Sequence, residues 1–120
     1  MANGYLFIES TEFTAMVKPY FRDDESYAEL QVFLIAQPDA GPVIAGAGPL
    51  RKLRWKDARR GKSKRGGLRI VYIHIPDARV LFMLDVYDKD EADDLTVGEK
   101  RELKTLADEL VRELRGRVGR

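Results

Sequence analysis

The chain has 120 residues, of which 44% are hydrophobic and 34% charged, with a net charge of +1, one histidine and no cysteine. This length predicts one domain spanning residues 1–120. The composition excludes a disulfide framework and thiolate chemistry, and it leaves almost no side chains for a zinc or iron site, so no metal or cofactor is expected. The first residues lack the pattern of a signal peptide and no stretch is apolar enough to span a membrane. We therefore expect a soluble cytoplasmic protein without a membrane partner.

A short strand at residues 5–8 is predicted to lead into a helix. Ser10 or Thr11 can cap this helix, which should run to about Phe21 because apolar residues recur at helical spacing. Pro19 stands late in the pattern and is expected to bend the helix or end it early.

A second helix, capped by Asp23 or Asp24, should end before Pro38. Residues 38–49 contain three prolines and three glycines, which leave no room for a helix. Three strands are predicted next, at about residues 50–56, 68–75 and 79–86. The last two are joined by a short turn and should pair antiparallel.

The C-terminal part is predicted to be a helix that follows an acidic stretch. Thr96 and Glu99 have the spacing of a capping box, and the helix should run to about Arg115. Its expected buried stripe consists of Leu103, Leu106, Ala107, Leu110 and Leu114. The predicted order is β-α-α-β-β-β-α, an α+β domain in which the helices pack on one face of an antiparallel sheet.

Positive charge is concentrated in residues 51–69, called the basic segment below. This segment contains ten lysines and arginines and one acid, Asp57, so it carries +9 while the rest of the chain sums to −8. Two alternating apolar and basic runs flank a glycine-rich loop, which is the pattern of a β-hairpin with a long cationic tip. Repulsion within such a cluster costs stability unless an anion balances it, and nucleic acid is the expected polyanion.

Side-chain alternation along the strands predicts which bases share a face. Lys52, Arg54 and Lys56 should point one way from the first strand of the hairpin. Arg69, on the next strand, should join them on the floor of a groove. The bases expected around this groove are Lys52, Arg54, Arg69, the loop residues Lys62, Lys64 and Arg65, and Lys89 at the far edge.

Three motifs stand in a recognisable order: IAGAGPLRKLR at residues 44–54, GKSKRGGLRIVY at 61–72 and VYDKDEADDLT at 86–96. Together with ESTEF at residues 9–13, they resemble the HigB branch of the RelE-type bacterial toxins. The match covers nearly the whole chain, which is identified by this resemblance as a single RelE/HigB-like toxin domain with a RelE-like fold.

Two departures from the family pattern are visible. Pro49 replaces the second glycine of the family's GGLRK, which should stiffen the entry to the strand. The usual YGKNE is YDKDE here, so that Asp88 and Asp90 flank Lys89. These acids would either weaken the effect of the lysine on RNA or hold the lysine in place.

The resemblance implies the toxin of a type II toxin–antitoxin pair, a metal-independent endoribonuclease that cuts mRNA on the translating ribosome and so inhibits translation. It implies contacts with mRNA and ribosomal RNA. It also implies a cognate antitoxin protein, which in the HigB branch is usually a small helix-turn-helix protein of the HigA type.

Metal-independent RNA cleavage uses the 2′-OH as nucleophile against the adjacent phosphate. The step needs a proton acceptor, a proton donor to the leaving 5′ oxygen and fixed positive charge on the phosphorane. The resemblance implies that lysine and arginine supply these functions. A lysine has an ordinary pKa near ~10.4, and neighbouring cations lower it toward a value suited to a base.

The role assignments are hypotheses. Arg54, Arg65 and Arg69 would hold the phosphates, because a guanidinium matches two phosphate oxygens. Lys52 or Lys62 would accept the proton, and Lys64 or Lys89 would assist the leaving group. The catalytic candidates are thus Lys52, Arg54, Lys62, Lys64, Arg69 and Lys89. The RNA-binding candidates are Arg51, Lys56, Arg59, Arg60, Arg65 and Trp55.

Each assignment has a structural alternative. A basic loop is often plain solvated surface, and any single lysine can be a phosphate contact rather than a catalyst. His74 has the side chain of a general base but stands in an apolar strand, which favours a structural role. Trp55 could stack on a nucleobase, yet an aromatic residue alternating with bases is more often core. Tyr72 and Tyr87 are likewise expected in the core or at a rim first.

Two other functions remain open. One is a ParE-like inhibitor of DNA gyrase from the same superfamily, although that type generally lacks a dense basic set on the central strands. The other is a non-catalytic module that binds RNA or the ribosome through charge alone.

Overall fold

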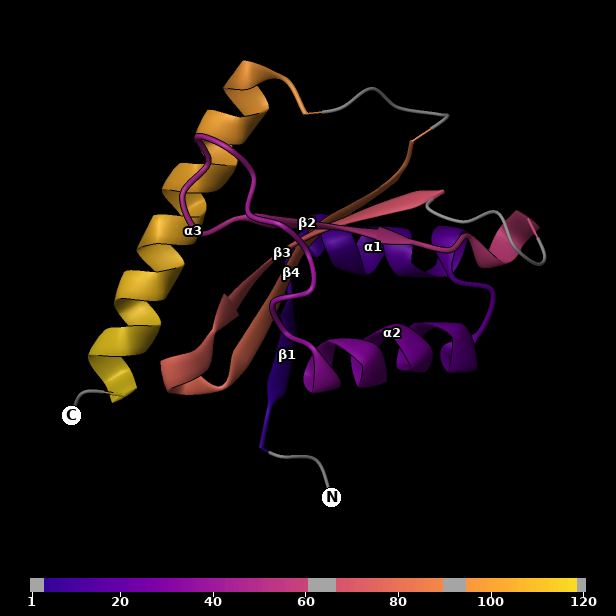
Figure 1. Ribbon diagram of the computed structural model, residues 1–120, viewed down its shortest axis with the longest axis horizontal. Helices are drawn as coiled ribbons and strands as arrows, with labels where there is room; N and C mark the ends of the chain where they lie inside the picture. Colours follow the sequence, from indigo (N-terminus) through magenta and orange to yellow (C-terminus); the bar gives the residue numbers. More distant parts are fainter. Residues whose placement is uncertain (1–3, 61–66, 90–94, 119–120) are drawn as a thin grey trace.

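The computed structural model describes residues 4–60, 67–89 and 95–118. Its elements follow the predicted β-α-α-β-β-β-α order, with two short 3₁₀ turns in addition (Figure 1). They are β1 (Leu6–Glu9), α1 (Thr11–Tyr20), α2 (Asp24–Ala36), β2 (Arg51–Trp55), η1 (Ala58–Arg60), β3 (Leu68–Ile75), η2 (Pro76–Ala78), β4 (Val80–Asp88) and α3 (Val97–Val118).

The four strands form one mixed sheet in the order β1-β4-β3-β2. β3 pairs antiparallel with both β2 and β4, whereas β1 runs parallel to β4. The prediction of a purely antiparallel sheet is therefore wrong at its β1 edge. Hairpin turns fix the direction of consecutive strands, but β1 is separated from β4 by two helices and two other strands, so no turn determines its direction.

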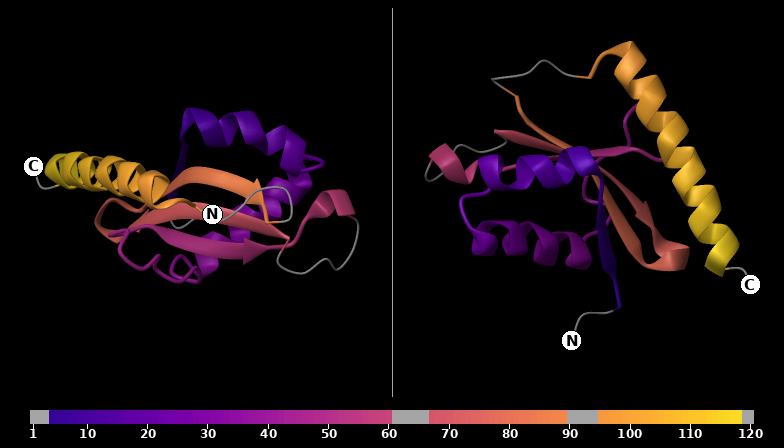
Figure 2. Two further views of the ribbon diagram at one scale, coloured as in Figure 1. Left: turned by 90° about the horizontal axis from the view of Figure 1, so that it is seen from above. Right: turned by 180° about the vertical axis from the view of Figure 1, so that it is seen from behind.

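Helices cover both faces of the sheet, contrary to the predicted packing on one face. One core contains Phe13 of α1 and Leu34 of α2 together with Ile70 and Tyr72 of β3. The second core lies on the other face and includes Ala107 of α3. Figure 2 shows α3 apart from the α1–α2 pair, with the strands between them. The reason is visible in β3, where the apolar side chains from Ile70 to Ile73 are buried in both directions, because a strand of this kind must be covered on both faces.

The predicted caps are present. Ser10 Oγ accepts a hydrogen bond from the Phe13 amide at 3.0 Å, and Asp23 Oδ1 accepts one from the Ser26 amide at 2.8 Å. At α3, the amide of Glu99 donates to Thr96 Oγ1 at 3.0 Å while the amide of Thr96 donates to the Glu99 carboxylate at 2.9 Å, a complete capping box. Local sequence signals thus set the beginnings of all three helices.

Helix ends and faces differ from prediction in detail. α1 continues through Pro19 to Tyr20, because a proline in the last turn interrupts little of the hydrogen-bond ladder. α3 extends beyond Arg115 to Val118. Leu106, expected in its buried stripe, is 40% exposed. None of the helices in the described ranges is long and apolar enough to cross a membrane.

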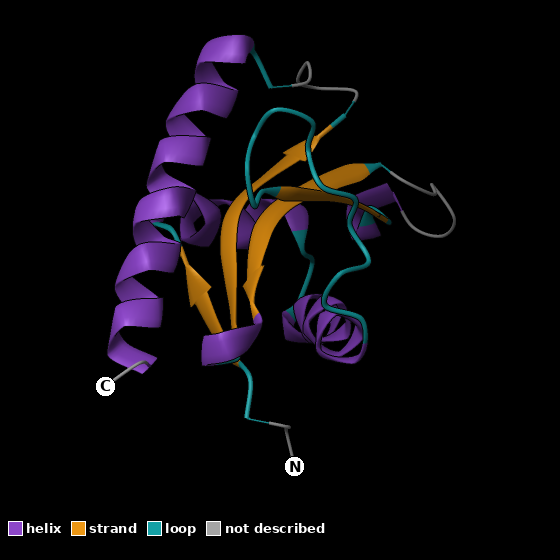
Figure 3. Cartoon of the chain, turned by 60° about the vertical axis from the view of Figure 1, so that its left-hand side comes forward, coloured by secondary structure: helices purple, strands orange, loops and turns teal. Residues whose placement is uncertain are grey.

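Residues 37–50, called the 37–50 segment below, contain no helix and lie along the outer edge of β2 (Figure 3). The Lys52 amide donates to the Pro42 carbonyl at 3.0 Å, and the Ile44 amide donates to the Leu50 carbonyl at 2.8 Å. Tyr72 Oη donates to the Pro38 carbonyl at 2.7 Å and accepts from the Gly41 amide at 3.0 Å. These hydrogen bonds therefore fix the 37–50 segment to the sheet.

Gly41 has to be a glycine for this close approach. A Cβ atom there would lie 3.0 Å from the Tyr72 ring and 3.1 Å from the backbone of Lys52 and Leu53. Such distances are shorter than van der Waals contact, so any larger residue would push the segment away from β2.

Candidate functional site

An open cavity of about 800 Å³ lies between β2, β3, the end of β4, the start of α3 and the 37–50 segment. One part of its lining is basic and includes Lys52, Arg54, Arg69, Lys89 and Lys100, with Tyr87 beside them. Another part is apolar: Ala40, Pro42, Val43, Ile44, Ala45 and Leu53. No carboxylate is among the described residues that line it. The described lining of the cavity therefore combines positive charge with apolar surface, which together suit an anion that also has an apolar part.

The sheet places two arginines directly opposite each other. Arg54 of β2 is in register with Arg69 of β3, and Arg69 is in register with Tyr87 of β4. Like charges facing each other across an antiparallel pair destabilise a sheet. Arg69 is also only 8% exposed, so its charge is held in a poorly solvated position. An anion bound between the two guanidinium groups would relieve this repulsion.

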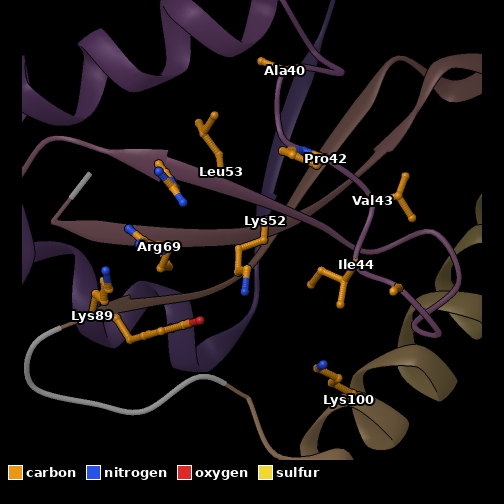
Figure 4. Close-up of a pocket in the computed structure, with 12 residues that line it drawn as sticks. Ala40, Pro42, Val43, Ile44, Lys52, Leu53, Arg69, Lys89 and Lys100 are labelled. Atoms are coloured by element: carbon orange, nitrogen blue, oxygen red, sulfur yellow. The ribbon is translucent and has the colours of Figure 1, made fainter. Parts of the chain in front are cut away.

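Lys52 and Lys89 border the same space (Figure 4). Lys52 precedes Arg54 by two residues and so lies on the same face of β2, as alternation predicts. Lys89 follows β4 and is positioned by its amide, which donates to the Gly67 carbonyl at 3.0 Å. Of the predicted catalytic residues, the structure thus brings together Lys52, Arg54, Arg69 and Lys89.

Other candidates of the basic segment lie elsewhere. Arg51 donates to the Gly41 carbonyl at 2.8 Å and lies 3.5 Å from an Asp39 oxygen, so it anchors the 37–50 segment. Lys56 follows the last residue of β2 and pairs with Glu29 of α2, so its expected place on the face of Lys52 and Arg54 is wrong. The strand simply ends before alternation could orient it. Neither side chain lines the cavity.

Trp55, an RNA-binding candidate, packs against the core on the α1–α2 side. Its ring lies 5.2 Å from that of Phe33, and it does not line the cavity. This is the core position that the sequence favoured for an aromatic residue between two bases.

Arg59, another RNA-binding candidate, bridges two fully buried carboxylates. Its Nη2 atom lies 2.8 Å from Asp57 Oδ2 and 2.5 Å from Asp88 Oδ2. Its guanidinium carbon also lies 4.6 Å from the ring centroid of Tyr20. The carboxylate of Asp88 thus turns into this buried network instead of facing the cavity beside Lys89. Asp88 therefore fixes the end of β4, immediately before Lys89, through its ion pair with Arg59.

Four further candidates are not placed by the structure. Lys62, Lys64 and Arg65 lie outside the described residues, as does the side chain of Arg60. Asp90 lies outside them too.

His74 has a structural environment, as its apolar strand predicts. Its Nε2 atom lies 2.6 Å from Tyr5 Oη, and its Nδ1 atom lies 2.8 Å from Asp39 Oδ1. The hydrogen bond from His74 holds the pKa of Asp39 below its usual range. Both ring nitrogens are engaged, and the ring ties β3 to the N-terminal residues and the start of the 37–50 segment. Within residues 4–60, 67–89 and 95–118, no group of three histidines, cysteines or carboxylates could hold a metal ion.

Three features of the cavity were missed or ranked low from the sequence. Tyr87 was expected in the core or at a rim first. It is buried in the core on the α3 side, at 8% exposure, and it also lines the cavity, a place for which its separation of two residues from Lys89 was the available signal. Lys100 carries no motif and comes to the cavity through the packing of α3. The apolar lining from Ala40 to Ala45 depends on how the 37–50 segment folds back along β2, which no local pattern specifies.

No protein-family model matches the chain. Among solved structures, it is similar to a double arginine-to-alanine mutant of the E. coli toxin RelE in the free state. The TM-score is 0.52 at 18% sequence identity, and the similarity covers 78% of this chain and 90% of that chain. At this level of identity, the likeness shows that the two proteins share a fold.

Proposed function

We propose that the chain is the toxin of a type II toxin–antitoxin pair and that it cuts mRNA without a metal ion, on the ribosome, and so inhibits translation. The observation that carries this proposal is the Arg54–Arg69 pair in a cavity that Lys52, Lys89 and Tyr87 also line and that no described carboxylate lines. The fold shared with a protein named as the toxin RelE supports it. So does the resemblance of three motifs to the HigB branch.

The chemistry assigns a role to each group at the cavity. Arg54 and Arg69 bind the oxygens of the scissile phosphate and stabilise the charge that grows on them when the 2′-OH attacks. Lys52 accepts the proton of that hydroxyl, and Lys89 protonates the leaving 5′ oxygen. Lys62 and Lys64 are alternatives for these two proton transfers. The proposed partner is an antitoxin of the helix-turn-helix HigA type, and the proposed location is the cytoplasm.

The test is induction of the chain in a bacterial host, followed by primer extension on a cellular transcript. We expect growth arrest and discrete cuts within translated codons. Arg69→Ala should slow cleavage by about 10²–10³-fold, the usual cost of removing one donor to a transition-state oxyanion. Arg112→Ala removes an arginine of α3 that does not line this cavity and serves as the control.

Other outcomes would decide between the competing functions. Growth arrest with DNA damage signalling and intact transcripts would favour a ParE-like gyrase inhibitor. Arrest with neither cuts nor DNA damage would favour a module that only binds RNA or the ribosome. Rescue by the neighbouring reading frame would support the antitoxin pairing, and cuts in deproteinised RNA incubated with the protein would refute the requirement for the ribosome.

A further inference from the structure

Lys100 lines the cavity from α3, across from the strands that bear the other cations. Figure 4 shows Lys100 and Ile44 directed into the same hollow as Lys52. The capping box at Thr96 and Glu99 fixes the beginning of α3 and hence the place of Lys100 one turn later. Cations therefore line the cavity from two sides, from the sheet and from α3.

The ammonium group of Lys100 has no acidic partner within the described ranges. Lys104, one turn further along the same helix, pairs with Asp108 at 2.9 Å and does not line the cavity. The carboxylate of Glu99, adjacent in sequence, accepts the hydrogen bond of the capping box. Lys100 thus has a charge available for a ligand, whereas the next lysine of the helix does not.

The wall beside Lys100 is apolar and rigid. The side chains of Pro42, Val43, Ile44 and Ala45 carry no hydrogen-bonding group. The hydrogen bond from the Lys52 amide to the Pro42 carbonyl, at 3.0 Å, fixes this stretch to β2, and the one from the Ile44 amide to the Leu50 carbonyl, at 2.8 Å, closes the segment on itself. A nucleotide combines a charged phosphate with a flat base of large apolar surface. A surface with a cation next to such a wall matches both parts.

We propose that Lys100 and residues 42–45 form a second nucleotide subsite, next to the one that holds the scissile phosphate at Arg54 and Arg69. Lys100 binds the phosphate of the neighbouring nucleotide, and its base lies against the apolar wall. This inference rests on the proposed function, since it extends the same RNA strand across the cavity. Because the wall side chains cannot form hydrogen bonds with base edges, their contribution to affinity is the same for different bases of equal size.

The test compares Lys100→Ala with Lys104→Ala in the full chain. The probe is a short single-stranded RNA with 2′-O-methyl riboses, which binds but cannot be cleaved, and binding is followed by fluorescence anisotropy over a range of salt concentrations. Loss of one phosphate contact should reduce the slope of log K against log salt by about 0.7. We expect this reduction for Lys100→Ala and an unchanged slope for Lys104→Ala, and equal slopes for the two variants would overturn the proposal.

A second measurement locates the contact. Neutral methylphosphonates are placed one at a time in the probe, and each is measured with the wild-type protein and with Lys100→Ala. At one position flanking the scissile phosphate, the methylphosphonate should weaken binding of the wild type but not of the variant, and an abasic site there should weaken binding about tenfold. The subsite would be refuted if no position showed this difference between the wild type and the variant, or if only the scissile phosphate itself showed it.

The two proposals fail in different ways. If Arg69→Ala slows cleavage in the cell as expected while Lys100→Ala behaves like Lys104→Ala, the subsite is wrong and the proposed function stands. If the wild-type protein cuts no RNA with or without ribosomes, the proposed function is wrong, and the subsite fails with it.

Discussion

Replacing Arg59 with alanine should destabilise the fold strongly, although Arg59 lies in the most basic part of the chain. The side chain donates to Asp57 from Nε at 3.0 Å and from Nη2 at 2.8 Å, and it reaches Asp88 at 2.5 Å. Both carboxylates are fully buried. Removing one partner of a buried ion pair typically costs about 3–5 kcal/mol, because the remaining charge stays desolvated. The partial exposure of Arg59, 29% of its side chain, favours the lower end, about 3 kcal/mol.

Urea unfolding of the purified protein at neutral pH measures this loss. Lys56→Ala is the matched control, since its pair with Glu29 is about half exposed and should contribute less than about 1 kcal/mol. Asp57→Asn and Asp88→Asn introduced together into Arg59→Ala should recover part of the stability, because they remove the buried negative charges. An Arg59→Ala loss no larger than that of Lys56→Ala would contradict this account of the network.

Three further predictions concern the cavity and its supports. Arg54→Gln should raise the free energy of unfolding by about 0.5 kcal/mol, because it removes a like-charge pair, while weakening RNA binding; lower stability in urea would contradict the repulsion. Tyr72→Phe should cost about 1–2 kcal/mol, because the buried amide of Gly41 and the Pro38 carbonyl lose their partner; an unchanged unfolding midpoint would contradict this anchoring. Burial raises the pKa of Asp85 above 3.8, so the folded protein binds this proton more tightly and loses stability as pH rises from that value through the raised pKa. In thermal unfolding, the Asp85→Asn variant should therefore gain more stability relative to the wild type at neutral pH than at acidic pH. A gain that does not change with pH would refute this assignment.

Most of the fold could be predicted from local signals. The caps at Ser10, Asp23 and Thr96 begin the helices where expected, because a side-chain acceptor three residues ahead of an amide is a purely local feature. The direction of β1 and the placement of α3 on the second face could not be predicted, since both depend on contacts between distant parts of the chain. The apolar run from Ile70 to Ile73 of β3 was the available signal that both faces needed cover.

The residues of the candidate site, too, could be predicted where a local rule places them and not where contacts between distant parts of the chain do. Alternation along two strands predicted that Lys52, Arg54 and Arg69 share a face, because the period of a strand is fixed by its backbone. Alternation gave the wrong face for Lys56, because this residue follows the last residue of β2. Lys100 reaches the cavity only through the packing of α3, so no reading of the basic segment could have found it.

The acidic remainder of the chain explains how an overall charge of +1 is compatible with a concentrated cationic site. Asp39 pairs with Arg51, Glu29 pairs with Lys56, and Asp88 pairs with Arg59. Each of these contacts withdraws a base of the basic segment from ligand binding and uses it to fix the 37–50 segment, α2 or the end of β4. No carboxylate is among the described residues that line the cavity. Part of the positive charge of the basic segment therefore supports the fold, while Lys52, Arg54 and Arg69 of the same segment line the cavity.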